Sequence, residues 1–208
     1  MPFRDRYLDV GLRQNPFVAR ACVEEPPRAF INRGIPNPPP PGSGALVQVI
    51  GDSGLGKSAH LNHWRTLTPG PYHYIVREPY RSRWRRPPIG PIVYGDEIDR
   101  MPSPLRRRWL HRLARESATA VIGTHIDLET EAERAGFTVM SYRLTVLDEP
   151  TLAVFLDRRL AASAIDDRYV RFSAAEIAEI FNASAGNPQR AEVAAHRVLA
   201  NRVNGSLS

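Results

Sequence analysis

The segment that most constrains the fold is a glycine-rich loop between an apolar run and a predicted helix. Residues 51–58 read Gly-Asp-Ser-Gly-Leu-Gly-Lys-Ser and match the phosphate-binding pattern G-x-x-x-x-G-K-[ST] at every fixed position. The apolar run 45–50 before the loop predicts a buried strand, and residues 58–64 after it can begin a helix whose N-terminal dipole favours bound anions. Strand, loop and helix in this order predict a phosphate site at the end of a strand.

The lysine of this loop is distinctive, because Lys57 is the only lysine among 28 basic residues. A compact ammonium on a flexible stem fits between β- and γ-phosphate oxygens in a way that a planar guanidinium does not. The glycines let backbone N–H groups close around the phosphates, and the hydroxyl of Ser58 can bind Mg²⁺. We therefore expect the nucleotide to be bound by Asp52, Ser53, Gly54, Leu55, Gly56, Lys57, Ser58 and Ala59.

The residues around the loop alternate between strand and helix patterns. This alternation predicts an α/β fold, with a parallel-sheet P-loop NTPase core and a small C-terminal helical lid. The expected strands are 45–50, 72–76, 91–95, 119–123 and 138–144, and the expected core helices are 57–66, 104–116 and 129–135.

Composition changes along the chain predict three parts. Residues 1–44 form a leader that ends in a Pro-rich tether, residues 45–148 form the core, and residues 149–208 form the helical lid. In the lid, a capping box at 173–176 and the pair Asn187-Pro188 mark two helix starts.

A second polar segment completes the expected site. The strand 91–95 ends in Asp96 and Glu97, where Asp96 is expected to hold Mg²⁺ and Glu97 to polarise the attacking water. The strand 119–123 ends in Thr124, which is expected to reach the γ-phosphate, and His125 is interpreted as a surface residue. The alternative for the acidic pair is an exposed acidic loop after an edge strand.

The chain has no run of 18 apolar residues and no signal-peptide pattern, so we expect a cytoplasmic protein without a membrane span. The single cysteine, Cys22, excludes an internal disulfide and a cysteine metal cluster.

Arginine is concentrated in the middle of the chain. Between Arg77 and Arg115 there are 11 arginines and four acids, which indicates a nucleic acid or an acidic protein as a partner. An ordinary solvated surface is the alternative. The expected partner-binding residues are Arg81, Arg83, Arg85 and Arg86 in a Pro-bounded loop, and Arg107, Arg108, Arg112 and Arg115 on one helix face.

These motifs together resemble those of the AAA+ ATPases, over about residues 10–203. The resemblance rests on the loop 51–58, the pair Asp96-Glu97, Thr124 in the sensor-1 place and the helical lid. It implies ATP and Mg²⁺ as cofactors, ATP hydrolysis, and assembly into a homo-oligomer. By position it also implies that Arg134 completes a neighbouring subunit's site as an arginine finger.

The leader 11–17 resembles the Gly-Leu-x-x-x-Pro-Phe lead-in of the secretion-linked and transposition-linked branch, which implies that Asn15 and Phe17 lie beside the adenine. The lid departs from that branch, because Gln189 stands where its sensor-2 arginine is expected and Arg190 comes one residue later. We expect Arg190 to take this role. The interval from Ser58 to Asp96 is also short, at 37 residues.

The sequence therefore favours an ATPase that drives or gates a partner. A nucleotide-dependent switch or nucleic-acid-binding module with little turnover is the alternative. A small-molecule kinase is a weaker third possibility, because no acceptor-substrate motif is visible.

Overall fold

The structure, a computed structural model, describes residues 7–17, 29–77 and 87–205. Contacts within the chain divide it into two units. The helical unit comprises residues 1–31 and 146–208, and the core unit comprises residues 32–145.

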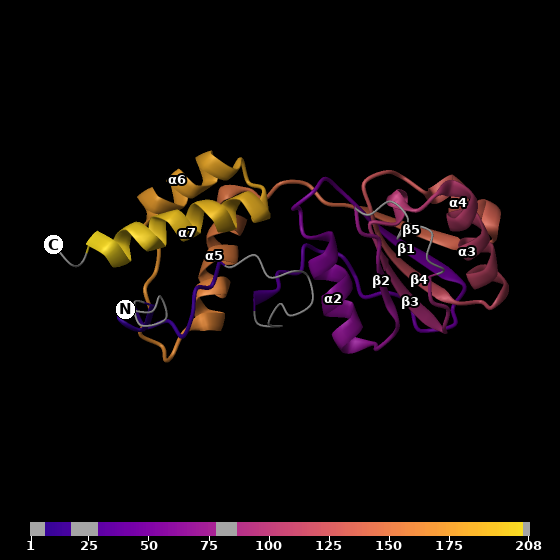
Figure 1. Cartoon of the computed structure of the whole chain (residues 1–208), viewed down its shortest axis with the longest axis horizontal. Coiled ribbons are helices and arrows are strands. Elements are labelled where there is room, and N and C mark those ends of the chain that lie inside the picture. Colours follow the sequence, from indigo (N-terminus) through magenta and orange to yellow (C-terminus); the bar gives the residue numbers. More distant parts are fainter. Residues whose placement is uncertain (1–6, 18–28, 78–86, 206–208) are drawn as a thin grey trace. The chain divides into compact units, whose positions relative to one another are not determined.

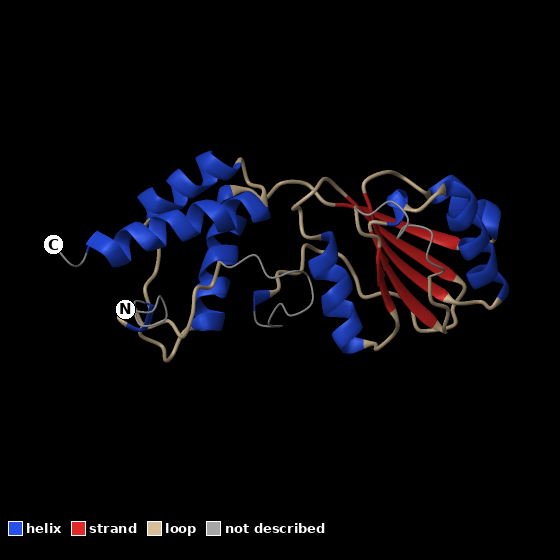
Figure 2. Cartoon of the chain, in the orientation of Figure 1, coloured by secondary structure: helices blue, strands red, loops and turns tan. Residues whose placement is uncertain are grey.

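The core unit is built on a five-stranded sheet in which every pair of neighbouring strands is parallel (Figure 2). Ile50 pairs with Thr124 and Gly95 pairs with Ile122, so the carboxyl ends of three strands lie at one edge. The strands follow the spatial order β2 (Tyr72–Tyr74), β3 (Ile92–Asp96), β4 (Thr119–Thr124), β1 (Ala45–Ile50) and β5 (Thr138–Arg143). The parallel sheet expected from the sequence is confirmed.

Helices cover both faces of this sheet (Figure 1). The helix α2 (Lys57–Leu67) packs on one face, and α3 (Ser103–Arg115) and α4 (Glu129–Ala135) pack on the other. Successive strand residues point to opposite faces. In β1, Leu46 therefore joins the cluster under α3, while Val47 joins the cluster under α2.

Element boundaries differ from the sequence-based ones by a few residues at most. The largest difference is in β2, which ends at Tyr74 rather than at residue 76. Ile75 is still buried and donates its N–H to the carbonyl of Asp96 at 3.0 Å, so it continues alongside β3 after the regular strand ends.

The helical unit contains α5 (Glu149–Ser163), α6 (Ala174–Ser184) and α7 (Pro188–Gly205). The predicted capping box is present, because Ser173 and Glu176 exchange side-chain to backbone hydrogen bonds. Leu12 and Phe17 of the leader are buried in the same apolar cluster as residues of all three helices. Within the described part of the chain, no helix is long and apolar enough to cross a membrane.

The expected leader and tether, residues 1–44, are divided between the two units. Residues 7–17 pack with the helices, whereas the Pro-rich stretch belongs to the core unit. There the N–H of Gly42 bonds to Pro91 at 2.9 Å, and Thr119 Oγ1 bonds to the Pro40 carbonyl at 2.7 Å. Hydrogen bonds therefore connect this segment to the residues at the starts of β3 and β4.

Candidate functional site

The phosphate-binding loop joins β1 to α2 at the carboxyl edge of the sheet. Gly54 and Gly56 have φ angles of 82° and 98°, which side-chain-bearing residues rarely adopt. Gly56 is also the N-cap of α2, so the loop leads directly into the N-terminus of the helix. Arg33 supports the loop from outside by donating to the Leu55 carbonyl at 3.3 Å.

Lys57 lies folded over its own loop. Its Nζ donates to the carbonyls of Gly51 at 2.8 Å and Asp52 at 3.2 Å, and the residue is 4% exposed. These hydrogen bonds use neutral carbonyl oxygens, and the nearest carboxylate oxygen, Glu97 Oε1, lies beyond hydrogen-bond distance at 3.7 Å. An incoming phosphate would offer it a charged acceptor and a stronger interaction.

Asp96 is buried at the end of β3 and accepts hydrogen bonds on both carboxylate oxygens. Ser58 Oγ donates to Oδ2 at 2.5 Å, Tyr72 Oη donates to the same oxygen at 2.8 Å, and the backbone N–H of Glu97 donates to Oδ1 at 3.0 Å. A Cβ at Gly123 would lie 2.5 Å from Oδ1, so only glycine leaves room for this carboxylate. The hydroxyl of Ser58 and the carboxylate of Asp96 meet at one point, and this donor set fits Mg²⁺.

Glu97 has a backbone conformation that is uncommon outside glycine, with φ 59° and ψ 37°. This turn aims its carboxylate at cationic groups. Arg100 lies 2.8 Å from Oε2, and Lys57 Nζ lies 3.7 Å from Oε1. Such strained residues concentrate at functional sites, which agrees with the catalytic role predicted for Glu97.

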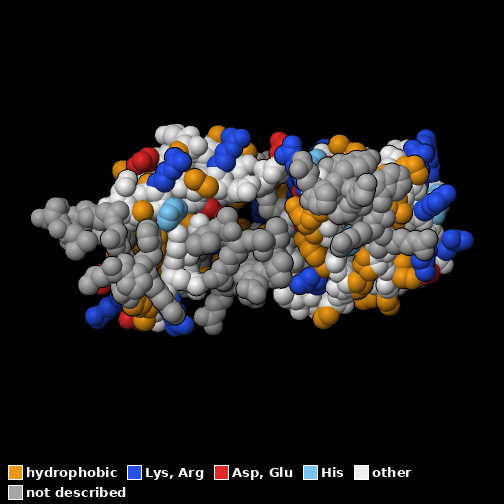
Figure 3. Space-filling model, in the orientation of Figure 1, with side chains coloured by type: hydrophobic (Ala, Val, Ile, Leu, Met, Phe, Trp, Pro, Cys, Tyr) orange, Lys and Arg blue, Asp and Glu red, His pale blue; other side chains and the backbone are white. Residues whose placement is uncertain are grey.

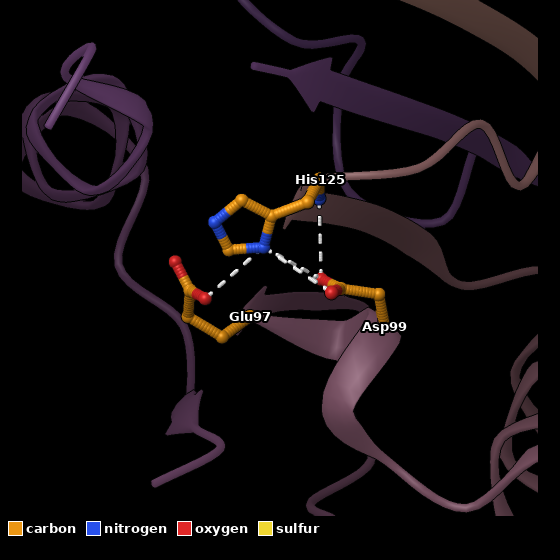
Figure 4. A group of neighbouring side chains, drawn as sticks. All are labelled: Glu97, Asp99 and His125. Carbon is orange, nitrogen blue, oxygen red and sulfur yellow. Dashed lines mark hydrogen bonds and ion pairs between the residues drawn. The ribbon is translucent and has the colours of Figure 1, made fainter. Parts of the chain in front are cut away.

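His125 was interpreted from the sequence as a surface residue, and the structure places it instead within the site. Its Nδ1 lies 3.2 Å from Asp99 Oδ2 and 3.3 Å from Glu97 Oε2 (Figure 4). The backbone N–H of His125 also donates to Asp99 Oδ1 at 3.2 Å. Asp99 follows Asp96 by three residues in the sequence, but this spacing alone does not predict a contact with the end of another strand.

Thr124 is buried at the end of β4. Its carbonyl accepts from the Gly51 N–H at 3.1 Å, which places it beside the phosphate-binding loop. Its Oγ1 donates to the Ile126 carbonyl at 2.8 Å, and the Ile126 N–H lies 3.2 Å from Oγ1. The hydroxyl therefore closes the turn after β4 in this structure, and its contact with a γ-phosphate stays a prediction.

Four further predicted site residues lie outside the phosphate-binding loop and the ends of β3 and β4. Arg134 is exposed at the C-terminal end of α4. Arg190 is exposed near the start of α7 in the helical unit. Phe17 is 4% exposed and packs on Phe172, and Asn15 bonds to the Phe17 N–H and to His196. The roles predicted for all four stay predictions.

The arginines between Arg77 and Arg115 differ in their surroundings. Arg81, Arg83, Arg85 and Arg86 lie outside the described residues. On α3, Arg107, Arg108, Arg112 and Arg115 are exposed, and basic side chains gather at the end of the core unit where this helix lies (Figure 3).

Arg106 does not belong to this surface. It is 6% exposed and forms two hydrogen bonds to Glu131, at 3.0 and 2.9 Å. Arg106 was not among the predicted partner-binding residues, and its charge is neutralised inside the unit.

His60 of α2 predicts a pH dependence of stability. Burial lowers its pKa from 6.5 to about 4, against an opposing effect of its hydrogen bond to the Gly56 carbonyl. The unfolded chain therefore takes up the proton first as pH falls, so stability is full above about pH 6.5 and is lost towards pH 4. The expected loss is roughly 3 kcal/mol, at about 1.4 kcal/mol per pKa unit.

Urea unfolding at pH 7.5 and 4.5 measures this loss. His60→Gln should show a smaller difference between the two pH values than the parent. The control His111→Gln, at an exposed position on α3, should keep the parental difference. An equal difference in His60→Gln and the parent would contradict the assignment.

Comparison with known proteins gives a likeness of fold. No family model matches the sequence, and no curated protein is significantly similar to it. Among solved structures, the Thermotoga maritima RuvB Holliday junction branch migration motor is 18% identical, with a TM-score of 0.55 over 78% of this chain. A point mutant of the same RuvB is also 18% identical, with a TM-score of 0.56 over 78% of this chain and 57% of its own.

The fold is that of the AAA+ P-loop ATPases, with the parallel sheet and C-terminal helices expected from the sequence. The chain spans 56% of the length of the RuvB motor. The narrower likeness to the secretion-linked and transposition-linked branch stays a prediction.

Proposed function

We propose that this chain is an AAA+ type ATPase that binds ATP with Mg²⁺ and hydrolyses it to drive or gate an assembly or a partner. The observation that carries the proposal is the meeting of three elements at one sheet edge. There Ser58 bonds to Asp96, Asp96 accepts from the backbone N–H of Glu97, and the Glu97 carboxylate lies 3.7 Å from Lys57 Nζ. This arrangement separates phosphate binding, metal binding and water activation among different side chains, as phosphoryl transfer requires.

Each residue has a distinct task in the proposed reaction. Lys57 exchanges its loop carbonyls for phosphate oxygens, and Ser58 with Asp96 holds the metal, which would neutralise charge on the phosphates. Glu97 accepts a proton from the attacking water. Because Arg100 is paired with its carboxylate, this step needs Glu97 to turn away from the guanidinium. Thr124 would contact the γ-phosphate by releasing the Ile126 carbonyl.

The remaining roles fall on residues outside the phosphate-binding loop and the ends of β3 and β4. We propose that Asn15 and Phe17 lie beside the adenine, and that Arg190 rather than Gln189 responds to the phosphates. The exposed Arg134 would enter the site of a neighbouring copy in a homo-oligomer. The RuvB likeness supports the fold that these roles assume, at 18% identity.

If Arg134 completes the site of a neighbouring subunit, ATP hydrolysis should depend on oligomer formation. ATP hydrolysis per chain, measured by phosphate release with Mg²⁺, should rise with protein concentration and level off once the oligomer forms. Arg134→Ala should lower the plateau by about 10³-fold or more, since arginine fingers supply about 10³–10⁵ in rate. Mass by light scattering on the same samples relates rate to assembly.

Arg197→Ala is the matched control, because this arginine is also exposed on a helix and has no proposed role. Its plateau should equal that of the parent. A constant rate per chain across concentrations at which the particle is monomeric would show that the site is complete in one chain.

The α3 surface favours a second function, a nucleotide-dependent switch or nucleic-acid-binding module with little turnover. The exposed arginines of this helix are Arg107, Arg108, Arg112 and Arg115. The neighbouring acid Glu116 forms an ion pair with one of them, Arg112, at 3.5 Å. Such an excess of positive charge on one helix face suits phosphate backbones or an acidic protein. Turnover distinguishes the two functions, because the switch would bind ATP without appreciable phosphate release.

Salt dependence tests the nucleic-acid version. Four phosphate contacts predict a log–log slope of affinity against salt of about −3 to −4. Replacing Arg107, Arg108 and Arg115 by alanine should flatten this slope by about two to three units in anisotropy titrations, because about 0.7–0.9 is lost per contact. The same triple variant should retain its affinity for ATP. If neither DNA nor RNA binds at about 50 mM salt and micromolar protein, the remaining explanation for the basic surface of α3 is an acidic protein partner.

A further inference from the structure

The proposed catalytic glutamate and two other side chains, from two segments of the chain, lie close together (Figure 4). Glu97 follows β3, Asp99 lies in the short 3₁₀ helix η3 (Ile98–Arg100), and His125 follows β4. One ligand atom from each residue lies within 4.8 Å of the other two. The proposed reaction uses only Glu97 of this group, so the function of the cluster is unexplained by it.

The distances suit a small tetrahedral metal ion. His125 Nδ1 lies 3.3 Å from Glu97 Oε2 and 3.2 Å from Asp99 Oδ2. Metal–ligand bonds of about 2.0–2.1 Å in tetrahedral geometry separate donor atoms by roughly 3.3–3.4 Å. The two distances from His125 Nδ1 to the carboxylate oxygens therefore already match the separation of two ligand atoms around a tetrahedral ion. Hydrogen bonds have similar lengths.

The second feature of the cluster is the burial of the Glu97 carboxylate, which is 8% exposed. Its Oε2 lies 2.8 Å from the Arg100 guanidinium and 3.3 Å from His125 Nδ1. Arginine therefore compensates the charge of this oxygen on one side, and the side toward His125 is where a metal ion would bind it.

We propose that Glu97, Asp99 and His125 form a regulatory site for Zn²⁺ or a similar transition-metal ion. Imidazole nitrogen with two carboxylates favours Zn²⁺ over Mg²⁺, and leaves a fourth position for water. The bound ion occupies the carboxylate of Glu97 and so stops it from accepting a proton from water. Nucleotide binding continues, because Lys57, Ser58 and Asp96 are not ligands of this ion.

Arg100 competes with the ion for Glu97. Its guanidinium lies on the same oxygen that the metal would bind, so the ion must displace it or share this oxygen with it. Removing Arg100 should therefore tighten metal binding, whereas removing a ligand should weaken it. These opposite changes distinguish a metal site from a cluster held only by hydrogen bonds and ion pairs.

Direct binding tests the site without reference to ATP hydrolysis. Co²⁺ is titrated into the full chain without nucleotide, and its visible absorption, which intensifies in tetrahedral sites, is followed; Zn²⁺ should then reverse the signal. One Co²⁺ per chain is expected. His125→Ala and Asp99→Asn should each weaken binding by at least about tenfold, since even outer-shell changes cost 10–100-fold. Arg100→Ala should bind more tightly than the parent.

Two controls locate the ion. His111→Ala, at an exposed histidine on α3, and Asp96→Asn, in the proposed Mg²⁺ site, should both keep the Co²⁺ spectrum. Absence of a tetrahedral Co²⁺ signal in the parent, or a signal that survives in His125→Ala, would overturn the site. Binding in Arg100→Ala that is no tighter than in the parent would overturn the competition.

The regulatory part rests on the proposed ATPase function. With excess Mg²⁺-ATP, Zn²⁺ should inhibit phosphate release by the parent over the range in which it displaces Co²⁺. The rate of His125→Ala, whatever its value without zinc, should not fall further in that range. Equal zinc inhibition of both proteins would overturn the regulation. A chain that binds Co²⁺ as expected but never hydrolyses ATP would refute the ATPase function and leave the metal site standing.

Discussion

Lys57→Ala is expected to lower the affinity for ATP by about 100-fold or more, since each charge-assisted hydrogen bond that is lost contributes about 1.5–3 kcal/mol. The ammonium now bonds to the carbonyls of Gly51 and Asp52, and phosphate oxygens are its proposed acceptors in the bound state. A fluorescent ATP analogue, titrated with and without Mg²⁺, measures the change. Binding within about threefold of the parent would contradict the role of Lys57.

Two controls separate the loss of phosphate contacts from damage to the loop. Lys57→Arg keeps the charge but replaces a point cation by a planar fork, so it should also bind weakly. Amine-reactive labelling offers a test without any mutation, because Lys57 is the only lysine in the chain. Bound ATP should protect Lys57 from acylation, and labelling at an unchanged rate in saturating ATP would count against contact between them.

Glu97→Gln is expected to leave ATP affinity within a few-fold of the parent and to reduce hydrolysis by about 10²–10⁴-fold, the usual contribution of a general base. The amide keeps the size of the side chain but cannot accept a proton from water. Glu97 does not contact Ser58 or Asp96 through its side chain in the interactions described, so metal and phosphate binding should survive. Phosphate release at saturating Mg²⁺-ATP measures the loss.

Glu116→Gln is a matched control for this change. It also replaces a glutamate that lies near an arginine, at 3.5 Å from Arg112, but on the exposed surface of α3. Its hydrolysis rate should equal that of the parent. If Glu97→Gln hydrolyses ATP as fast as Glu116→Gln, another group must activate the water.

Local patterns were enough to predict the core fold. The run 45–50, the loop 51–58 and the strand that ends in Asp96 each carry their signal in neighbouring residues, because burial and turn geometry act over short distances. Parallel strands place their carboxyl ends at one edge, so the convergence of Lys57, Asp96 and Glu97 followed from the order of elements. In the structure, Lys57 Nζ lies 3.7 Å from Glu97 Oε1, and the Glu97 backbone N–H donates to Asp96 Oδ1.

The residues with which charged side chains form ion pairs or hydrogen bonds could not be predicted from local patterns. Arg106 and Glu131 lie on different helices, and nothing local distinguishes Arg106 from its exposed neighbour Arg107. The hydrogen bond of Tyr72 to Asp96 joins the edge strand β2 to β3, and the two residues are 24 positions apart in the sequence. These pairings depend on the register between elements, which the pattern of a single element does not contain.

The sequence by itself determined the phosphate loop, the acidic pair and the alternation of strands and helices, since each depends on local spacing, and parallel strands end at a common edge. Only the tertiary structure decided that the partly buried His125 joins Asp99 and Glu97, and that Arg100 pairs with the Glu97 carboxylate. The physical reason is that Glu97 and Asp99 follow β3 whereas His125 follows β4, so these side chains meet only when the two strands pair.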